Sequence, residues 1–475
     1  MQRMRISNLA DLRRLFERSS QLMYTEKQNT SPGFFIADIY KKLAISFSNK
    51  IPNAAVFGEK GAGKTFLLKI LSNIREWSEF CSVCMKGDAD NAVLIPIYWS
   101  HNESEEGRKS LVYSQIKSLR RINRCICDDK ILYNHQILRT FFSTPQQMLP
   151  SEWRELWFKF FCQCLGFSGK HAITYESEFK QRVSEFTTPV VYLCDGLEDL
   201  FSEWLFRDMQ IEPLRVLIQD ILRDIPSWAG SKFGLLVFIR NDMVRRAATQ
   251  NPGQYFANYR DFEIKWSKED ALKLVGWLLN TQELQKYRSN QSCEDWDARD
   301  FQPMCNDLVP LWGAKLGNPK STASPTVYWV LSCVSDLQGH FQARDIIRLL
   351  NKAAGLQMRR PLPEDRLLSP SAIRAALKEC GEDKIEETKL EMKHIAADLG
   401  KISFWQPAMP LTHKSLEQIG ISSTVALEDA GILLRAGDTF FLPEIYRKGF
   451  GLELNKVART KVYSLMKKAW GKVGV

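Results

Sequence analysis

The stretch AAVFGEKGAGKTFLLKIL, residues 54–71, decides the fold, because it joins an apolar run to a glycine-rich turn and then to a segment with helical spacing. The turn fits the pattern G-x-x-x-x-G-K-[ST], and its context of strand before and helix after is the one in which that pattern binds phosphate. Glycines let consecutive backbone N–H groups point at phosphate oxygens, and the helix adds its positive N-terminal end. The sequence therefore predicts a phosphate-binding loop made of Gly58, Glu59, Lys60, Gly61, Ala62, Gly63, Lys64, Thr65 and Phe66.

Two side chains of this loop carry the chemistry of nucleotide binding. We expect Lys64 to reach the β- and γ-phosphates and Thr65 to place its hydroxyl on a magnesium ion. ATP and Mg²⁺ are therefore the expected cofactors. A glycine-rich turn without any ligand is the alternative, and a full match in this context makes it much the rarer case.

The segment PVVYLCDGLEDLF, residues 189–201, predicts the second half of the site. A buried parallel strand is an unbroken apolar run, and its carboxyl end opens onto the crevice where ligands bind. We expect Asp195, at that end, to hold Mg²⁺, and either Glu198 or Asp199 to polarise the attacking water. The ordinary alternative for an acidic residue after a strand is a helix N-cap.

Further apolar runs at 92–100, 232–240 and 260–266 alternate with helical patterns, which predicts a parallel α/β sheet. Beyond residue 267 the strand pattern stops, and helices follow to about residue 355. The proline-rich segment RRPLPEDRLLSPS marks a boundary. One amphipathic helix at 382–399, a short helix and a hairpin that turns at Ala436-Gly437-Asp438 then suggest a winged helix.

We therefore expect an α/β fold with a P-loop NTPase parallel-sheet core, a helical lid and a C-terminal winged-helix-like domain. The expected division is an N-terminal helical segment at 1–30, a core at 31–266 with a helical insertion at about 101–188, a lid at 267–358 and the last domain at 366–475.

Composition limits the class of protein. The 475 residues carry a net charge of +10 and include no apolar run of about 18 residues, so we expect a cytosolic protein without a membrane span. An odd number of cysteines, 11, argues against a disulfide framework. Basic residues gather near the C-terminus, at Lys456, Arg459, Lys461, Lys467 and Lys468.

The order of these elements, over about residues 30–450, resembles the AAA+ and STAND class of P-loop ATPases. GEKGAGKT and VVYLCDGLED are similar to the STAND form of the site, with Gly196 where AAA+ proteins usually carry a glutamate. The strand ending VFIRND, with Arg240, occupies the place of sensor 1. The helix GHFQARDIIRLL resembles the lid helix that carries sensor 2, which the resemblance assigns to Arg344.

The C-terminal stretch FFLPEIYRKGFGLEL is similar to a group of uncharacterised bacterial P-loop ATPases, which also carry a strand that ends like VFIRND and a lid element like RDIIRLL. Relatives of STAND type commonly act in signalling and in defence against phage, so the resemblance implies a role of that kind. ATPases of this class also need a cation from a neighbouring subunit, for which Arg245, Arg246 and Arg260 are the candidates. This implies a homo-oligomer.

Three functions follow. The first is an ATP-hydrolysing oligomeric switch that senses or regulates a partner effector protein in antiviral defence. The second is a DNA-acting AAA+ ATPase of initiator or loader type, and the third is a nucleotide-binding scaffold without turnover. The short helix STVALEDAG offers Glu428 and Asp429 where a DNA-reading helix would carry basic or amide side chains, so we expect only non-specific DNA contact.

Overall fold

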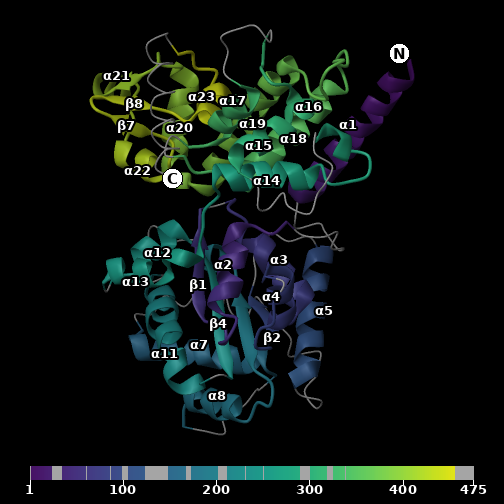
Figure 1. Ribbon diagram of the computed structural model, residues 1–475. Coiled ribbons are helices and arrows are strands. Elements are labelled where there is room, and N and C mark those ends of the chain that lie inside the picture. The colour runs from purple at the N-terminus through teal and green to yellow at the C-terminus, as the bar shows by residue number, and fades with distance from the viewer. Residues whose placement is uncertain are drawn as a thin grey trace. The chain divides into compact units, whose positions relative to one another are not determined.

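The computed structural model forms two compact units (Figure 1). The helical unit comprises Met1–Tyr24 and Trp266–Val475, and the sheet unit comprises Thr25–Lys265. The structure describes residues 2–23, 35–59, 61–85, 87–98, 105–122, 148–166, 173–201, 211–230, 232–249, 251–288, 300–317, 325–336 and 339–454.

The sheet unit is built on five parallel strands in the order β2-β3-β4-β1-β5. These strands are β1 (Ala54–Gly58), β2 (Val93–Tyr98), β3 (Val190–Cys194), β4 (Phe233–Arg240) and β5 (Glu263–Ile264). Residues of β1 to β4 are buried almost throughout, as expected for parallel strands covered on both faces. The predicted parallel α/β core is therefore confirmed.

The register brings the carboxyl ends of the central strands together. Gly58 pairs with Arg240 on one side and with Ile264 on the other. Because β1 lies between β4 and β5, the residues that follow Gly58 and Arg240 lie close together at the carboxyl ends of these strands.

Helices cover this sheet. They are α2 (Asp38–Ser46), α3 (Lys64–Ile74), α4 (Trp77–Met85), α5 (Glu105–Ile122), α7 (Pro150–Cys164), α8 (Tyr175–Ser184), α9 (Leu197–Leu200), α10 (Ile211–Arg215), the π-helix η3 (Val216–Ile221), α11 (Leu222–Ala229), α12 (Asn241–Ala247), α13 (Pro252–Tyr259) and the 3-10 helix η4 (Arg260–Phe262). Three of them, α5, α7 and α8, fall in the insertion expected at about 101–188.

An aromatic cluster fixes α7 and α8 on the sheet. Phe179 of α8 lies 5.0 Å from Phe233 of β4 and 5.7 Å from Phe161 of α7, measured between ring centroids. Tyr192 of β3 joins the cluster and donates its hydroxyl to the Phe161 carbonyl at 2.9 Å. Such ring pairs add about 1 kcal/mol each beyond the area that they bury.

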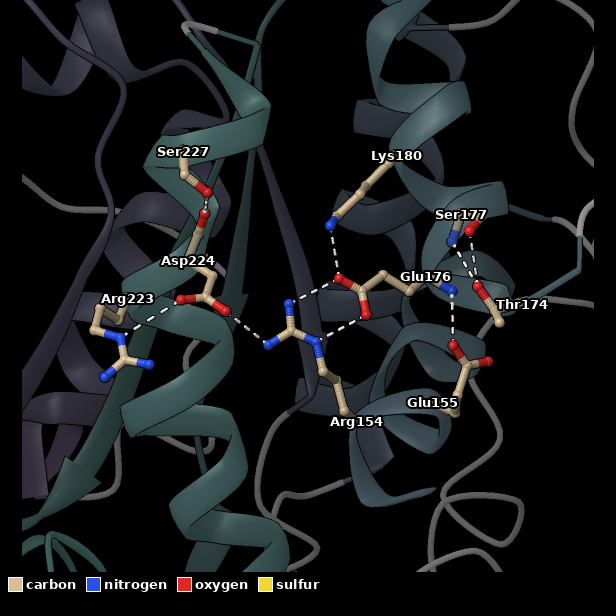
Figure 2. Close-up of polar contacts among 9 residues, drawn as sticks. All are labelled: Arg154, Glu155, Thr174, Glu176, Ser177, Lys180, Arg223, Asp224 and Ser227. Atoms are coloured by element: carbon tan, nitrogen blue, oxygen red, sulfur yellow. Dashed lines mark hydrogen bonds and ion pairs between the residues drawn. The ribbon is translucent and has the colours of Figure 1, made fainter. Parts of the chain in front are cut away.

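A polar cluster joins α7, α8 and α11 (Figure 2). Arg154 donates to both oxygens of Glu176 at 2.8 Å and to Asp224 at 2.9 Å. The neighbouring Glu155 accepts from the backbone N–H of Tyr175 at 2.8 Å, at the start of α8, where a carboxylate also meets the positive end of the helix. Every charged group of this cluster therefore has a partner.

The helical unit contains α1 (Gln2–Met23), α14 (Lys268–Leu278), the 3-10 helix η5 (Gln285–Tyr287), α15 (Phe301–Asp307), α16 (Val309–Trp312), α17 (Thr326–Val334), α18 (Ala343–Gln357), α19 (Pro370–Glu391), α20 (Lys393–Trp405), α21 (His413–Gln418), α22 (Thr424–Asp429) and α23 (Glu444–Gly449). A small antiparallel sheet has the order β6-β8-β7, from β6 (Leu411–Thr412), β7 (Leu434–Ala436) and β8 (Thr439–Phe441). None of the helices, over the residues that the structure describes, is long and apolar enough to cross a bilayer.

The N-terminal helix packs within the helical unit. Asn351 of α18 donates its amide N–H groups to the Phe16 carbonyl at 2.9 Å and to the Ser19 and Ser20 hydroxyls at 3.0 and 2.7 Å. Residues 1–30 are expected to form a segment of their own, and α1, which covers most of it, lies against α18, the helix that carries Arg344.

Two details of the C-terminal part can be compared with expectation. The single helix expected at 382–399 is interrupted at Met392, where α19 ends and α20 begins. The hairpin of β7 and β8 turns at Gly437, whose φ of 67° suits glycine, and this confirms the predicted turn. Helix α20, strand β6, helices α21 and α22 and the hairpin follow one another in this order along the chain.

Candidate active site

The phosphate loop forms a tight turn between β1 and α3. Gly61 and Gly63 have φ values of 78° and 104°, which lie in the left-handed region that glycine adopts without strain. At Gly58, an added Cβ would come within 3.1 Å of the Ile264 carbonyl oxygen. Gly61 and Gly63 therefore suit this backbone, Gly58 leaves little room for a side chain, and the turn leads directly into the N-terminus of α3.

Lys64 is enclosed by the loop. Its Nζ donates to the carbonyl oxygens of Gly58 and Glu59, each at 3.0 Å. Burial lowers the pKa of Lys64, although Glu198 and Asp195 act in the opposite direction. An ammonium group held by neutral carbonyls in a buried loop is suited to a phosphate oxygen, which would offer it a full negative charge.

The predicted partners Thr65 and Asp195 meet. The Thr65 hydroxyl donates to Asp195 Oδ2 at 2.6 Å, although the two residues lie 130 positions apart. Asp195 directly follows β3 and is buried, and its backbone N–H donates to the Tyr98 carbonyl at 2.9 Å. The structure therefore joins the phosphate loop to the end of the third strand.

The carboxylates of Asp195 and Glu198 are incompletely compensated by positive charge and hydrogen bonds. Burial, and then the charge of Glu198, raise the pKa of Asp195 to about 7. Glu198 Oε2 is buried and has no hydrogen-bond partner among the described residues. A divalent cation at this point would relieve both conditions.

These oxygen donors fit Mg²⁺. The described residues include no cluster of three or more His, Cys, Asp or Glu side chains that could hold a metal alone. Magnesium in ATPase sites usually needs only one or two carboxylates, because waters and substrate phosphates complete its coordination. Thr65 and Asp195 are the residues that would hold it.

The two candidate acids on α9 differ in their electrostatic influence on the site, and that of Glu198 is the larger. The charge of Glu198 is the largest electrostatic influence on Lys64 and also the largest on Asp195. Asp199 donates its backbone N–H to the Gly196 carbonyl at 3.0 Å in the same short helix. Both carboxylates therefore stay candidates for the catalytic acid at this point.

The end of β4 supplies two polar side chains. Arg240, the expected sensor, forms a two-point ion pair with Asp242 at 3.1 and 2.6 Å. The next residue, Asn241, donates instead to Glu59 of the phosphate loop at 3.2 Å and to Glu263 at 3.0 Å. Asn241 is not among the predicted site residues, although a polar residue directly after a strand is the signal that could have identified it.

The remaining predicted arginines belong to other elements. Arg245 and Arg260 are exposed and Arg246 is half-buried, on α12 and η4. Arg344 belongs to the helical unit, where it pairs with Glu387 of α19. Lys60 and the five basic residues from Lys456 to Lys468 lie outside the described residues.

A phosphate loop between β1 and α3, an aspartate that ends β3, and a five-stranded parallel sheet define a P-loop NTPase fold. No family of known proteins matches the sequence, and no curated protein matches it either.

Solved structures give weak similarities. The Aeropyrum pernix ORC1 protein, determined in complex with DNA, is 13% identical over 94% of this chain and 96% of that one, with a TM-score of 0.37. The Aeropyrum pernix ORC2 protein, determined as ADPNP and ADP complexes, is 12% identical over 97% and 98% of the two chains, with a TM-score of 0.30. Neither score is high enough to carry an argument about this chain.

Proposed function

We propose that the chain binds ATP together with Mg²⁺ and hydrolyses it to ADP and phosphate. The observation that carries this proposal is the Thr65–Asp195 hydrogen bond of 2.6 Å beside a buried Lys64. In this proposal Lys64 binds the β- and γ-phosphates, the loop N–H groups orient them, and Glu198 accepts a proton from the attacking water. Bound Mg²⁺ would neutralise phosphate charge.

The electrostatics of the site support turnover as well as binding. Charge that develops on the γ-phosphate would meet an ammonium already held in place, so little reorganisation is needed. The Glu198 oxygen without a partner is available to a water molecule. Asp199 stays the second candidate for the catalytic acid, and Arg240 and Arg344 stay candidates for sensing the γ-phosphate.

The same proposal includes assembly of the chain into a homo-oligomer. Arg245 and Arg260 are exposed, so in an assembly they could meet the charge that develops on the phosphate of a neighbouring subunit. A head-to-tail contact of that kind generates a ring or an open filament. We therefore propose a homo-oligomer of AAA+ type.

Lys64→Ala tests the central proposal. Loss of the buried ammonium should reduce hydrolysis by at least roughly 100-fold and weaken ATP binding, because phosphate charge loses its fixed counter-cation. Phosphate release and binding of a fluorescent ATP analogue would be measured on the same preparations. Turnover equal to that of the wild type would exclude this site as the source of activity.

The winged-helix-like part favours a DNA-acting role of initiator or loader type. It exposes Lys414 on α21 and Arg435 on β7, where backbone phosphates could be met. Glu428 on α22 argues against base reading, so we propose contact that does not depend on sequence. Regulation of a partner effector in antiviral defence, as the STAND resemblance implies, is the alternative, and a scaffold without turnover is the third.

Salt dependence separates these roles. If Lys414 and Arg435 contact DNA phosphates, replacement of each by alanine should lower the slope of log K against log salt by about 1. ATP hydrolysis should also rise several-fold with duplex DNA near physiological salt. Indifference of both measurements to DNA would favour the effector role.

A further inference from the structure

The carboxyl end of β1 is spanned by one side chain. Asn241, the first residue after β4, donates one amide N–H to Glu263 Oε1 at 3.0 Å on β5 and the other to Glu59 Oε1 at 3.2 Å in the phosphate loop. The strand order β4-β1-β5 places β1 between the strands that supply Asn241 and Glu263. The amide therefore crosses the point at which the phosphate loop leaves the sheet.

The orientation of this amide is fixed by its partners. Both partners are carboxylates, which only accept hydrogen bonds, so the NH₂ group must face them. The amide Oδ1 is then buried without a hydrogen-bond partner in the described structure. An unpaired buried acceptor destabilises a fold by about 1–3 kcal/mol, so this arrangement is not the one that stability alone would favour.

The contact continues from Glu59 to Lys64. The Glu59 side chain is held by Asn241, while its backbone carbonyl accepts from Lys64 Nζ at 3.0 Å and from the Ala62 N–H at 3.2 Å. Glu263 is steadied in turn by Lys265, whose Nζ lies 2.6 Å from Glu263 Oε2. A chain of contacts thus runs from β5 through Asn241 to the carbonyl that positions the phosphate-binding ammonium.

We propose that Asn241 is a positioning residue that holds the leading edge of the phosphate loop in its nucleotide-binding shape through Glu59. The inference rests on the proposed ATPase function and deepens it. Asn241 acts on binding by preordering the loop, since a loop that must be ordered on binding loses affinity. Loss of the contact therefore weakens ATP binding more than it slows the chemical step.

The test is a double-mutant cycle on the full chain with Asn241→Ala, Glu59→Ala and the double variant. Each single variant is expected to raise the KM for ATP roughly tenfold with kcat within about twofold, as for one charge-assisted hydrogen bond. The double variant should be no worse than either single one, because both remove the same contact. Glu59→Gln, which keeps a carbonyl acceptor without the charge, should give a smaller rise than Glu59→Ala.

Asn53→Ala is the matched control. Asn53 precedes β1 at its other end, donates to the Leu222 carbonyl at 2.8 Å, and also has a buried Oδ1 without a partner. Its replacement should lower the melting temperature without changing KM. If Asn241→Ala does not fold, Glu59→Ala decides alone, because Glu59 is exposed and its loss cannot disrupt the core.

Three outcomes would overturn the inference: additive effects in the cycle, a fall in kcat at unchanged KM, or an unchanged KM in Glu59→Ala. Lys64→Ala separates these from failure of the proposed function. If ATP binding depends on Lys64 but not on Asn241, only the positioning role is wrong. If binding does not depend on Lys64, the ATPase assignment itself is wrong.

Discussion

Two groups of charged residues in the sheet unit, one around Arg154 and one around Lys64, differ in the direction in which their pKa values are shifted. Around Arg154, hydrogen bonds dominate: the bond to Glu176 raises the pKa of Arg154, and although burial acts to raise the pKa of Glu176, its bonds to Arg154 and Lys180 lower it. Around Lys64, burial dominates, so the pKa of Lys64 is lowered and that of Asp195 is raised. One cluster favours its charged forms, and the other disfavours them.

The difference separates a structural cluster from a site that lacks its ligand. Charges that are paired and partly hydrated join α7, α8 and α11 without further help (Figure 2). Charges that are buried and incompletely paired are costly to the fold and are typical of functional sites. Nucleotide and Mg²⁺ would supply the missing counter-charges around Lys64 and Asp195.

The largest expected effect concerns Glu198, the proposed catalytic acid of the site around Lys64. Glu198→Gln should reduce hydrolysis roughly 100- to 1000-fold and leave ATP bound, because the amide cannot accept the proton of the attacking water. Asp199→Asn, one residue along the same short helix, is the matched comparison and should change turnover much less. Single-turnover phosphate release with pre-bound ATP measures both. The reverse ranking would transfer the role to Asp199.

Removal of Arg154 tests the balanced cluster. Arg154→Ala leaves Glu176 and Asp224 without their shared partner and should lower the free energy of unfolding by about 2–3 kcal/mol, since charge-assisted hydrogen bonds of a partly exposed cluster are lost. Arg223→Ala removes only a largely exposed arginine, 3.5 Å from Asp224, and should change it by less than about 0.5 kcal/mol. Urea unfolding gives both values. ATP affinity should be unchanged in the two variants, and a large loss of affinity in Arg154→Ala would contradict the separation of the clusters.

The phosphate loop and Asp195 could be predicted because each is encoded locally. A strand, a glycine turn and a helix specify their own geometry, and an apolar run specifies where a buried strand ends. The Glu59–Asn241–Glu263 contact could not be predicted, because it depends on β5 lying beside β1. Nothing in the sequence of residues 260–266 states which strand will be its neighbour.

The helical unit shows the same limit. The packing of α1 on α18 joins Phe16 to Asn351, which lie 335 residues apart, so no local pattern could indicate it. The interruption at Met392 carries no glycine or proline signal, and the amphipathic pattern continues across it. Local periodicity therefore predicts where helices occur, whereas the residues at which they end and the elements on which they pack depend on tertiary contacts.

The smallest expected effect concerns Glu387 in the helical unit, a carboxylate that is stabilised by arginines as Glu176 is. Its carboxylate pairs with Arg344 and, at 2.8 Å, with Arg348. Although burial acts to raise it, these arginines lower the pKa of Glu387 from 4.5 to about 2. A carboxyl whose pKa is lowered by folding stabilises the fold above its unfolded pKa, and this stabilisation is lost as the pH falls toward the folded pKa.

Glu387→Gln should therefore lower the free energy of unfolding by about 2 kcal/mol at pH 7, since the amide keeps one acceptor but loses the charge. The difference from the wild type should shrink as the pH falls below 4.5 toward 2, because protonation makes the wild-type carboxyl neutral as well. Urea unfolding between pH 7 and pH 3 measures this difference.

Asp383→Asn, one turn earlier on α19 and paired with Lys352 at 2.9 Å, is the matched control. This partly exposed pair should contribute about 0.5 kcal/mol. A Glu387→Gln difference that is independent of pH would mean that packing, and not charge, is what Glu387 contributes.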